Sequence, residues 1–196
     1  MKLAINGIIK FLLGVIMVSL LLFIPAGTLE YWNAWVFMGL LFIPMIFVGI
    51  WLFVKKPELL EKRLNGNEKE KTQKIVILFS VIIFVAGFII CGLDFKNKWT
   101  NANVLSTIMG AIVLLLSYIL YVEVLKENAY LSRNVEIQKE QKLINTGMYR
   151  IVRHPMYAAT ILLFLAMPLV LGSIISFIVF LIYPVIIAKR IKNEEE

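Results

Sequence analysis

Residues 154–188 read HPMYAATILLFLAMPLVLGSIISFIVFLIYPVIIA and contain no Lys, Arg, Asp or Glu. As one helix they would extend about 52 Å at ~1.5 Å per residue, well beyond the ~30 Å hydrocarbon core of a membrane. Gly172 near the middle, with Pro168 just before it, favours a turn. We therefore predict a hairpin of two short helices, Met156–Leu171 and Ser173–Ala188. At about 24 Å each they are shorter than the core, so we expect them to tilt little, to thin the bilayer or to turn within it.

The rest of the chain is similarly apolar. Of its 196 residues, 60% are hydrophobic and only 17% are charged, and the mean hydropathy is +0.85, which is typical of a membrane protein and not of a soluble domain. Four further charge-free stretches are each long enough to cross a membrane: Phe11–Leu29, Tyr31–Val54, Ile75–Leu93 and Trp99–Val122. The fold class predicted is an all-α polytopic transmembrane helix bundle with five to six membrane segments, the last two forming the short hairpin.

The distribution of basic residues predicts the topology. With six alternating segments, eighteen of the twenty Lys and Arg residues fall on one side of the membrane, and only Lys96 and Lys98 fall on the other. Because cytoplasmic loops are enriched in Lys and Arg, we expect both termini to be cytoplasmic. A five-segment arrangement would divide the same residues fifteen to five, which is less favourable but stays open. The formal net charge of +7 then needs no nucleic-acid partner.

Two cytoplasmic loops are predicted, and they differ in kind. Residues 55–74 mix charges of both signs densely and contain Asn65-Gly66, so we expect a solvated connector. Residues 126–153 instead interleave apolar and hydrogen-bonding side chains, which indicates a segment that packs against the bundle. The single cysteine, Cys91, lies in an apolar stretch and excludes a disulfide or a cysteine-based metal site within one chain. No metal site is predicted.

A polar segment precedes the hairpin. Residues 149–160 read YRIVRHPMYAAT and include the only histidine, His154. A hairpin that turns near Gly172 returns Arg190 and the final glutamates to the side of the membrane where His154 and Tyr157 lie. The sequence therefore predicts a polar site facing the cytosol. Taken singly, Arg190 and Glu194 also fit an exposed i,i+4 pair that contributes only about 0.3 to 0.5 kcal/mol.

Two motifs carry a family resemblance. The run NTGMYRIVRHPMY, at 145–157, and Arg190-x-x-x-Glu194-Glu195 about 30 residues later resemble the isoprenylcysteine carboxyl methyltransferase family. Phospholipid methyltransferases share these elements, and upstream segments such as AGTLEYWNAW and GLDFKNKW look similar too. The resemblance implies a single integral-membrane methyltransferase-like domain, 1–196. Its S-adenosylmethionine site would be formed by loop 125–155 and the end of the chain, 189–196.

The same resemblance implies roles for individual residues. Arg190 and Arg153 would act on the methyl acceptor as catalytic residues. The implied cofactor contacts are Gln138, Gln141, Lys142, Leu143, Ile144, Tyr149, His154, Pro155, Met156, Tyr157, Glu194 and Glu195.

The chemistry of these side chains agrees with that assignment. S-adenosylmethionine carries a sulfonium and an ammonium, which suit carboxylates and aromatic faces. Methyl transfer to a carboxylate needs no general base, because the oxygen is already ionised at pH 7. An amine acceptor would first need deprotonation, with His154 or a glutamate as the base. This contrast favours a carboxylate acceptor, held by Arg190 or Arg153.

The sequence leaves several functions open. The favoured one is methylation of a prenylated or other lipidic acceptor drawn from the bilayer, with no nucleic acid involved. Alternatives are a phospholipid amine methyltransferase, an NADPH-dependent membrane reductase of related fold, and a non-catalytic membrane protein. The identity of the acceptor and the oligomeric state stay undetermined.

Overall fold

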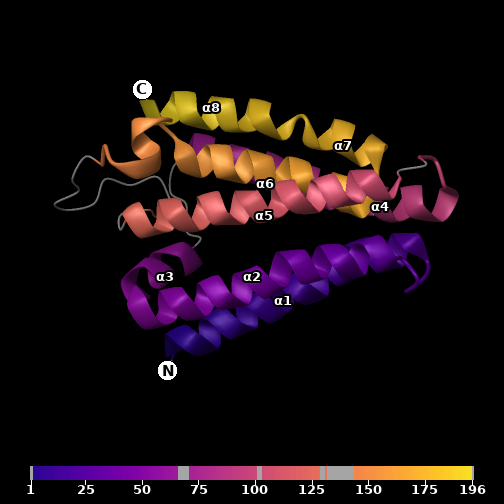
Figure 1. Ribbon diagram of the computed structural model, residues 1–196, viewed down its shortest axis with the longest axis horizontal. Helices are drawn as coiled ribbons and strands as arrows, with labels where there is room; N and C mark the ends of the chain where they lie inside the picture. The colour runs from indigo at the N-terminus through magenta and orange to yellow at the C-terminus, as the bar shows by residue number, and fades with distance from the viewer. Residues whose placement is uncertain (1, 66–70, 101–102, 129–130, 132–143, 196) are drawn as a thin grey trace.

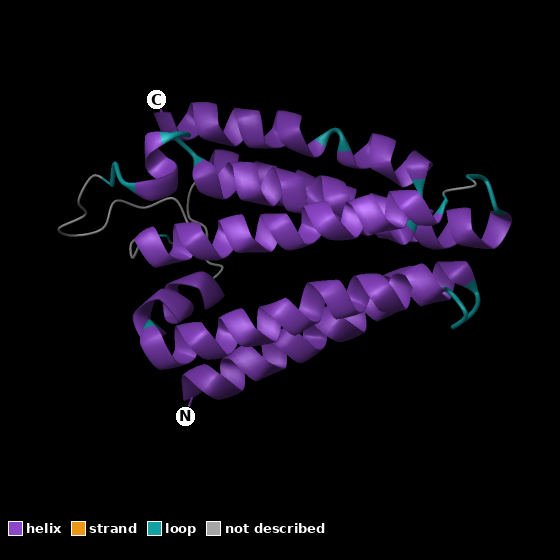
Figure 2. Ribbon diagram, in the orientation of Figure 1, coloured by secondary structure: helices purple, strands orange, loops and turns teal. Residues whose placement is uncertain are grey.

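The computed structural model describes residues 2–65, 71–100, 103–128, 131 and 144–195, and within these it is a helical bundle (Figures 1 and 2). The helices run in the order α1 (Lys2–Ala26), α2 (Trp32–Lys55), α3 (Pro57–Leu64), α4 (Lys71–Asn97), α5 (Val104–Glu127), the 3₁₀ helix η1 (Gly147–Arg150), α6 (Pro155–Leu171), α7 (Ile174–Phe180) and α8 (Tyr183–Glu195). The predicted all-α fold class is confirmed.

The chain crosses the length of the bundle six times. In Figure 1 both termini lie at the same end, together with α3, and we call this the terminal end. The connections from α1 to α2, from α4 to α5 and from α6 to α7 lie at the other end, here called the distal end. Which end faces the cytoplasm stays a prediction.

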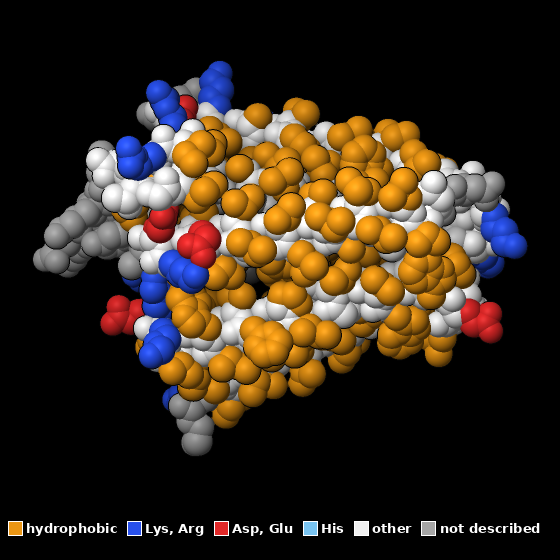
Figure 3. Space-filling model, viewed as in Figure 1, with side chains coloured by type: hydrophobic (Ala, Val, Ile, Leu, Met, Phe, Trp, Pro, Cys, Tyr) orange, Lys and Arg blue, Asp and Glu red, His pale blue; other side chains and the backbone are white. Residues whose placement is uncertain are grey.

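Apolar side chains fill the core of the bundle and also cover its outer surface. Five helical segments are long and apolar enough to cross a membrane, and the shorter α6 lies beside them. Ile24, Phe47 and Val185 are each 68% exposed, which is expected where lipid replaces water as the solvent. Figure 3 shows this apolar surface between two ends that carry the charged side chains.

The predicted hairpin is confirmed, and its turn lies where expected. Gly172 ends α6 with φ +75°, a left-handed conformation that glycine adopts without a steric penalty. Ser173 then caps α7, its Oγ accepting the Ser176 N–H at 3.1 Å. Asp94 of α4 accepts a hydrogen bond from the same Ser173 hydroxyl, so α4 holds the turn from the side.

Side chains from α2 and its N-cap satisfy the last carbonyls of α6. Tyr31 OH donates to Leu171 O at 2.6 Å, and Asn33 Nδ2 donates to Val170 O at 3.0 Å. A helix end leaves such carbonyls without intrahelical partners, and within a membrane water does not replace them. These two buried side chains therefore stabilise the hairpin turn.

Small residues allow the helices to approach closely. A Cβ placed on Gly110 of α5 would lie 2.6 Å from the Val170 backbone nitrogen of α6. A Cβ on Gly92 of α4 would lie 2.6 Å from the Leu22 carbonyl oxygen of α1. Such contacts are typical of membrane helix packing, where dispersion contacts replace the hydrophobic effect.

The second arm of the hairpin differs from the prediction of one short helix, Ser173–Ala188. It is divided between Phe180 and Tyr183, because Pro184 lacks a backbone N–H and its ring conflicts with the carbonyl four residues earlier. The arm also continues to Glu195, so residues 174–195 are long enough to cross a membrane. The prediction that this arm is too short was therefore wrong.

The predicted solvated connector at 55–74 is also wrong in part. Pro57–Leu64 form α3, whose Leu59 is only 2% exposed and packs with Leu52 and Leu125. Lys56 Nζ donates to the carbonyls of Leu125 and Lys126 at the end of α5, at 2.9 and 2.7 Å. Lys56 and α3 thus attach the end of α2 to the end of α5 through non-covalent contacts.

Candidate functional site

The candidate site begins at the first turn of α6. His154 is the N-cap residue and Pro155 the first residue of the helix, where proline is favoured because its missing N–H would have no intrahelical partner. Pro155 is buried and fixes the direction in which the chain enters the bundle. The side chains of His154 and Tyr157, three positions apart, lie on one side with their rings stacked at 5.8 Å between centroids.

The end of α8 returns to this turn. Arg190 Nε donates to Tyr157 OH at 2.8 Å and to Glu194 Oε1 at 3.2 Å, and Tyr157 OH donates to the same glutamate oxygen. The Arg190 guanidinium also lies over the Tyr157 ring, 5.6 Å from its centroid. The two arms of the hairpin therefore meet through a three-residue hydrogen-bonded set.

A second pair extends this contact. His154 Nε2 lies 2.9 Å from Glu195 Oε1, so consecutive glutamates of α8 contact two different side chains at the start of α6. We call His154, Tyr157, Arg190, Glu194 and Glu195 the polar cluster. The predicted return of the C-terminal residues to the HPMY segment is present in the structure.

Burial distinguishes the polar cluster from a solvated helix end. The Arg190 and Glu194 side chains are only 15% and 19% exposed, whereas the i,i+3 pair of Lys126 and Glu123 is about half exposed. Glu195 is 48% exposed and His154 28%, so the cluster opens to solvent on its histidine side. A partly buried carboxylate with both a cation and a phenol is poised to accept a cationic ligand group in place of a protein partner.

Tyr149 has a different setting from the other predicted cofactor residues. It lies in η1, and its hydroxyl accepts a hydrogen bond from Asn128 Nδ2 at 2.7 Å. Burial raises the pKa of Tyr149 above its ordinary value of 10.0, while the hydrogen bond from Asn128 acts in the opposite direction. The phenol is therefore neutral at physiological pH.

The other predicted site residues fall into three groups. Arg153 is exposed, next to His154 in the chain. Met156 packs against the cluster of Leu52, Leu59 and Leu125, and Ile144 is half-buried. The remaining predictions lie outside the described residues: Gln138, Gln141, Lys142 and Leu143.

Sequence reasoning missed two residues next to the site, Glu127 and Asn128 at the end of α5. Both contact η1 across a separation of about twenty residues. No local pattern marks them, since a carboxylate and an amide at a helix end are usually solvated. The available signal in the sequence was Gly147 of NTGMY. A glycine inside such a motif indicates either a positive φ or a close neighbour, and Gly147 has both.

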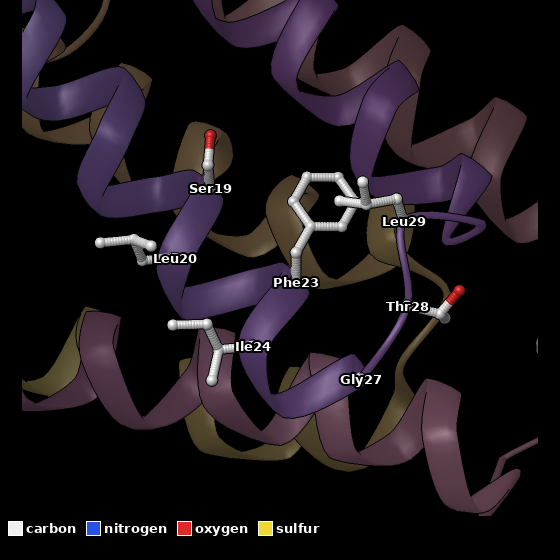
Figure 4. A pocket seen from close by; sticks show the side chains of 7 residues that line it. All are labelled: Ser19, Leu20, Phe23, Ile24, Gly27, Thr28 and Leu29. Atoms are coloured by element: carbon white, nitrogen blue, oxygen red, sulfur yellow. The ribbon is translucent and has the colours of Figure 1, made fainter.

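A hollow elsewhere on the molecule is not part of this site. It lies at the distal end of α1 and is lined by Ser19, Leu20, Phe23, Ile24, Gly27, Thr28 and Leu29 (Figure 4). Its lining is mainly apolar and offers only two hydroxyl groups. Within the described residues, no group of three or more His, Cys, Asp or Glu side chains is arranged to hold a metal ion.

Comparison with known proteins supplies one match. The family model described as isoprenylcysteine carboxyl methyltransferase (ICMT) family matches residues 107–196. The matched part extends from α5 to the end of α8, so it includes η1 and all of the polar cluster. Neither a curated protein nor a solved structure matches the chain.

Proposed function

Because residues 107–196 match the model of the isoprenylcysteine carboxyl methyltransferase family, we propose that this integral membrane protein uses S-adenosylmethionine to methylate a carboxylate of a lipidic acceptor. This match confirms the resemblance carried by the two sequence motifs. The observation that most supports the proposal is the polar cluster, in which Glu194 of α8 contacts Tyr157 and Arg190.

The side chains present fit this cofactor. Glu194 offers a partly buried carboxylate to an ammonium or sulfonium, and Glu195 lies one residue further on. Tyr157 and His154 provide stacked rings for the adenine or for the cation. When bound, the cofactor supplies an electrophilic methyl group on a positively charged sulfur.

Arg190 is placed to hold the acceptor. Its guanidinium lies between Tyr157 and Glu194 and matches the geometry of a carboxylate in a bidentate pair. The acceptor oxygen would form a bond to the methyl carbon as the carbon–sulfur bond breaks, and no proton moves. The residues therefore act by aligning the two reactants and excluding water, not by acid–base chemistry.

The setting of the cluster accounts for a lipidic acceptor. It lies at the start of α6, and between this end and the distal end the outer surface of the bundle is apolar (Figure 3). A prenyl or acyl chain can remain among the helices or in the bilayer while its carboxylate reaches Arg190. Cofactor would arrive from the solvent on the more exposed histidine side.

A second candidate is methylation of a phospholipid amine. The contact between His154 and Glu195, at 2.9 Å, is the observation that favours it, because a histidine oriented by a carboxylate can remove a proton from an ammonium. The pH dependence separates the two reactions. A carboxylate acceptor is ionised throughout pH 6 to 9, whereas the reactive fraction of an amine acceptor rises with pH across that range.

Calorimetric titration of the detergent-solubilised protein with S-adenosylhomocysteine and with NADPH tests the cofactor assignment. We expect binding of S-adenosylhomocysteine alone. Binding of NADPH alone would identify a reductase, and binding of neither would support a non-catalytic protein. Methyl transfer from labelled cofactor to a prenylcysteine or to phosphatidylethanolamine would then identify the acceptor class.

A further inference from the structure

Gly147 lies against the carboxylate of Glu127. A Cβ built on this glycine would meet the Glu127 carboxylate, which would then have to move aside. Its φ of +49° independently favours glycine. The backbone conformation therefore favours glycine where η1 begins, and the absence of a side chain leaves room for the Glu127 carboxylate at the end of α5.

Glu127 supplies the cap that η1 lacks locally. Thr146 occupies the N-cap position but makes no side-chain cap hydrogen bond. Instead, the Met148 N–H donates to Glu127 Oε2 at 3.1 Å. A carboxylate at this position also interacts favourably with the positive end of the helical turn, so a residue from another helix holds the first turn of η1.

Asn128 adds a second attachment to the next part of the same turn. Its Nδ2 donates to Tyr149 OH at 2.7 Å. Beyond Tyr149 the turn continues, since the N–H groups of Ile151 and Val152 both donate to Met148 O at 3.1 Å. The geometry set at Met148 and Tyr149 is thereby transmitted to Val152, two residues before His154.

We propose that Glu127 and Asn128 are positioning residues that fix η1 against α5, and so set the placement of Tyr149 and His154 for cofactor binding. This proposal rests on the function proposed above. The hydrogen bonds of the two residues described above are with η1, and they act on the polar cluster through it. We call Glu127, Asn128, Gly147 and Met148 the clasp.

Three variants at two positions test the clasp by S-adenosylhomocysteine titration. Glu127→Ala removes the acceptor for the Met148 N–H and should weaken binding about tenfold or more. Glu127→Gln retains an acceptor oxygen and should bind within threefold of the parent. Glu123→Ala, one turn earlier in an exposed pair with Lys126, is the matched control and should bind as the parent does.

Two results would overturn the positioning role. Binding by Glu127→Ala within twofold of the parent would show that the clasp has no effect on the cofactor site. An equal loss in Glu127→Gln and Glu127→Ala would show that the charge matters and not the cap. If Glu127→Ala does not fold, Asn128→Ala takes its place, with the same tenfold loss expected and a loss below twofold contradicting the role.

A ligand-free measurement separates failure of the clasp from failure of the proposed function. Hydrogen exchange at the Met148 amide should be faster in Glu127→Ala than in the parent and in Glu127→Gln. In addition, Gly147→Ala should destabilise the parent more than it destabilises Glu127→Ala, because the carboxylate it would meet is then absent. Equal exchange rates or additive effects would contradict the clasp even if the parent binds S-adenosylhomocysteine. Conversely, a parent that binds none would contradict the proposed function while these two differences still support the clasp.

Discussion

Arg190 donates to Tyr157 and to Glu194, so one guanidinium links both arms of the hairpin. The motif predicted that these side chains meet, because a turn near Gly172 returns the chain to the same end. It did not predict their hydrogen bonds, since several rotamers of a long side chain satisfy the same spacing. The clasp was missed for a related reason: Glu127 and Gly147 approach through the tertiary fold alone.

We expect Arg190→Gln to separate acceptor from cofactor. The substitution removes the charge that would pair with a carboxylate, and an ionic hydrogen bond contributes about 1.5 to 3 kcal/mol, or roughly 10- to 150-fold in kcat/KM for the acceptor. S-adenosylhomocysteine should still bind within about threefold, because Tyr157 continues to hold Glu194. The control is Lys189→Gln, an exposed neighbour. If Arg190→Gln instead lost S-adenosylhomocysteine binding and kept the parent's kinetics for the acceptor, Arg190 would be a cofactor residue and not an acceptor residue.

Tyr149 makes a pH-dependent contribution whose sign follows from its raised pKa. When the folded state has the higher pKa, the stabilisation is fully present below the unfolded value of 10.0 and is lost as the pH rises through the folded value. The difference in Tm between the parent and Tyr149→Phe should therefore be constant from pH 7 to 9 and should decrease above pH 10. A difference that changes between pH 7 and 9 would show that the phenol ionises there.

At the scale of elements, the lengths of the apolar stretches and one glycine predicted the hairpin. Its second arm was mispredicted because Pro184 divides it into α7 and α8, and because a helix does not stop where its charge-free stretch ends. The helix α3 was hidden by its charges: Leu59 is buried although five of the eight residues of Pro57–Leu64 are charged or proline. A helix with many charges of both signs, such as α3, is exposed to solvent on one face and can still bury the other.

The hairpin turn should depend on Asn33. Its amide donates to Val170 O and to Thr107 Oγ1 within the bundle, and Asn33→Leu leaves both oxygens without this donor. We expect the free energy of unfolding to fall by about 1 to 2 kcal/mol. This value lies between the average contribution of an interhelical hydrogen bond in a membrane and the cost of leaving a buried polar group unsatisfied. Unfolding in mixed micelles measures it. Asn97→Leu, at an exposed bond within α4, is the control and should change stability by less than about 0.5 kcal/mol. If Asn33→Leu and Asn97→Leu changed the free energy of unfolding equally, the hydrogen bonds of Asn33 would not specifically stabilise the hairpin turn.

At the scale of the whole molecule, both termini and the polar cluster lie at one end of the bundle (Figure 1). Composition and hydropathy predicted five to six crossings, because membrane thickness fixes the length of a helix that spans it. They did not predict how the six crossings pack, which depends on close approaches such as that of Gly110 to α6.

The predicted orientation rests on the asymmetry of eighteen basic residues against two. We expect Asn145→Cys to react with a membrane-impermeant maleimide only from the cytoplasmic side, and Lys98→Cys only from the opposite side. Native Cys91 is fully buried and should give little background. Labelling of both positions from one side, or in the reverse pattern, would contradict the topology and the cytosolic access of the cofactor.

The central claim is that the return of α8 to α6 forms a site for S-adenosylmethionine, and Glu194→Gln with S-adenosylhomocysteine calorimetry tests it most directly. The substitution keeps the shape and removes the charge of a side chain that is 19% exposed. Losing an ionic hydrogen bond of about 1.5 to 3 kcal/mol should weaken binding roughly 10- to 150-fold, while Glu123→Gln leaves it unchanged. A parent that binds no S-adenosylhomocysteine, or a Glu194→Gln variant that binds it within twofold of the parent, would contradict the account.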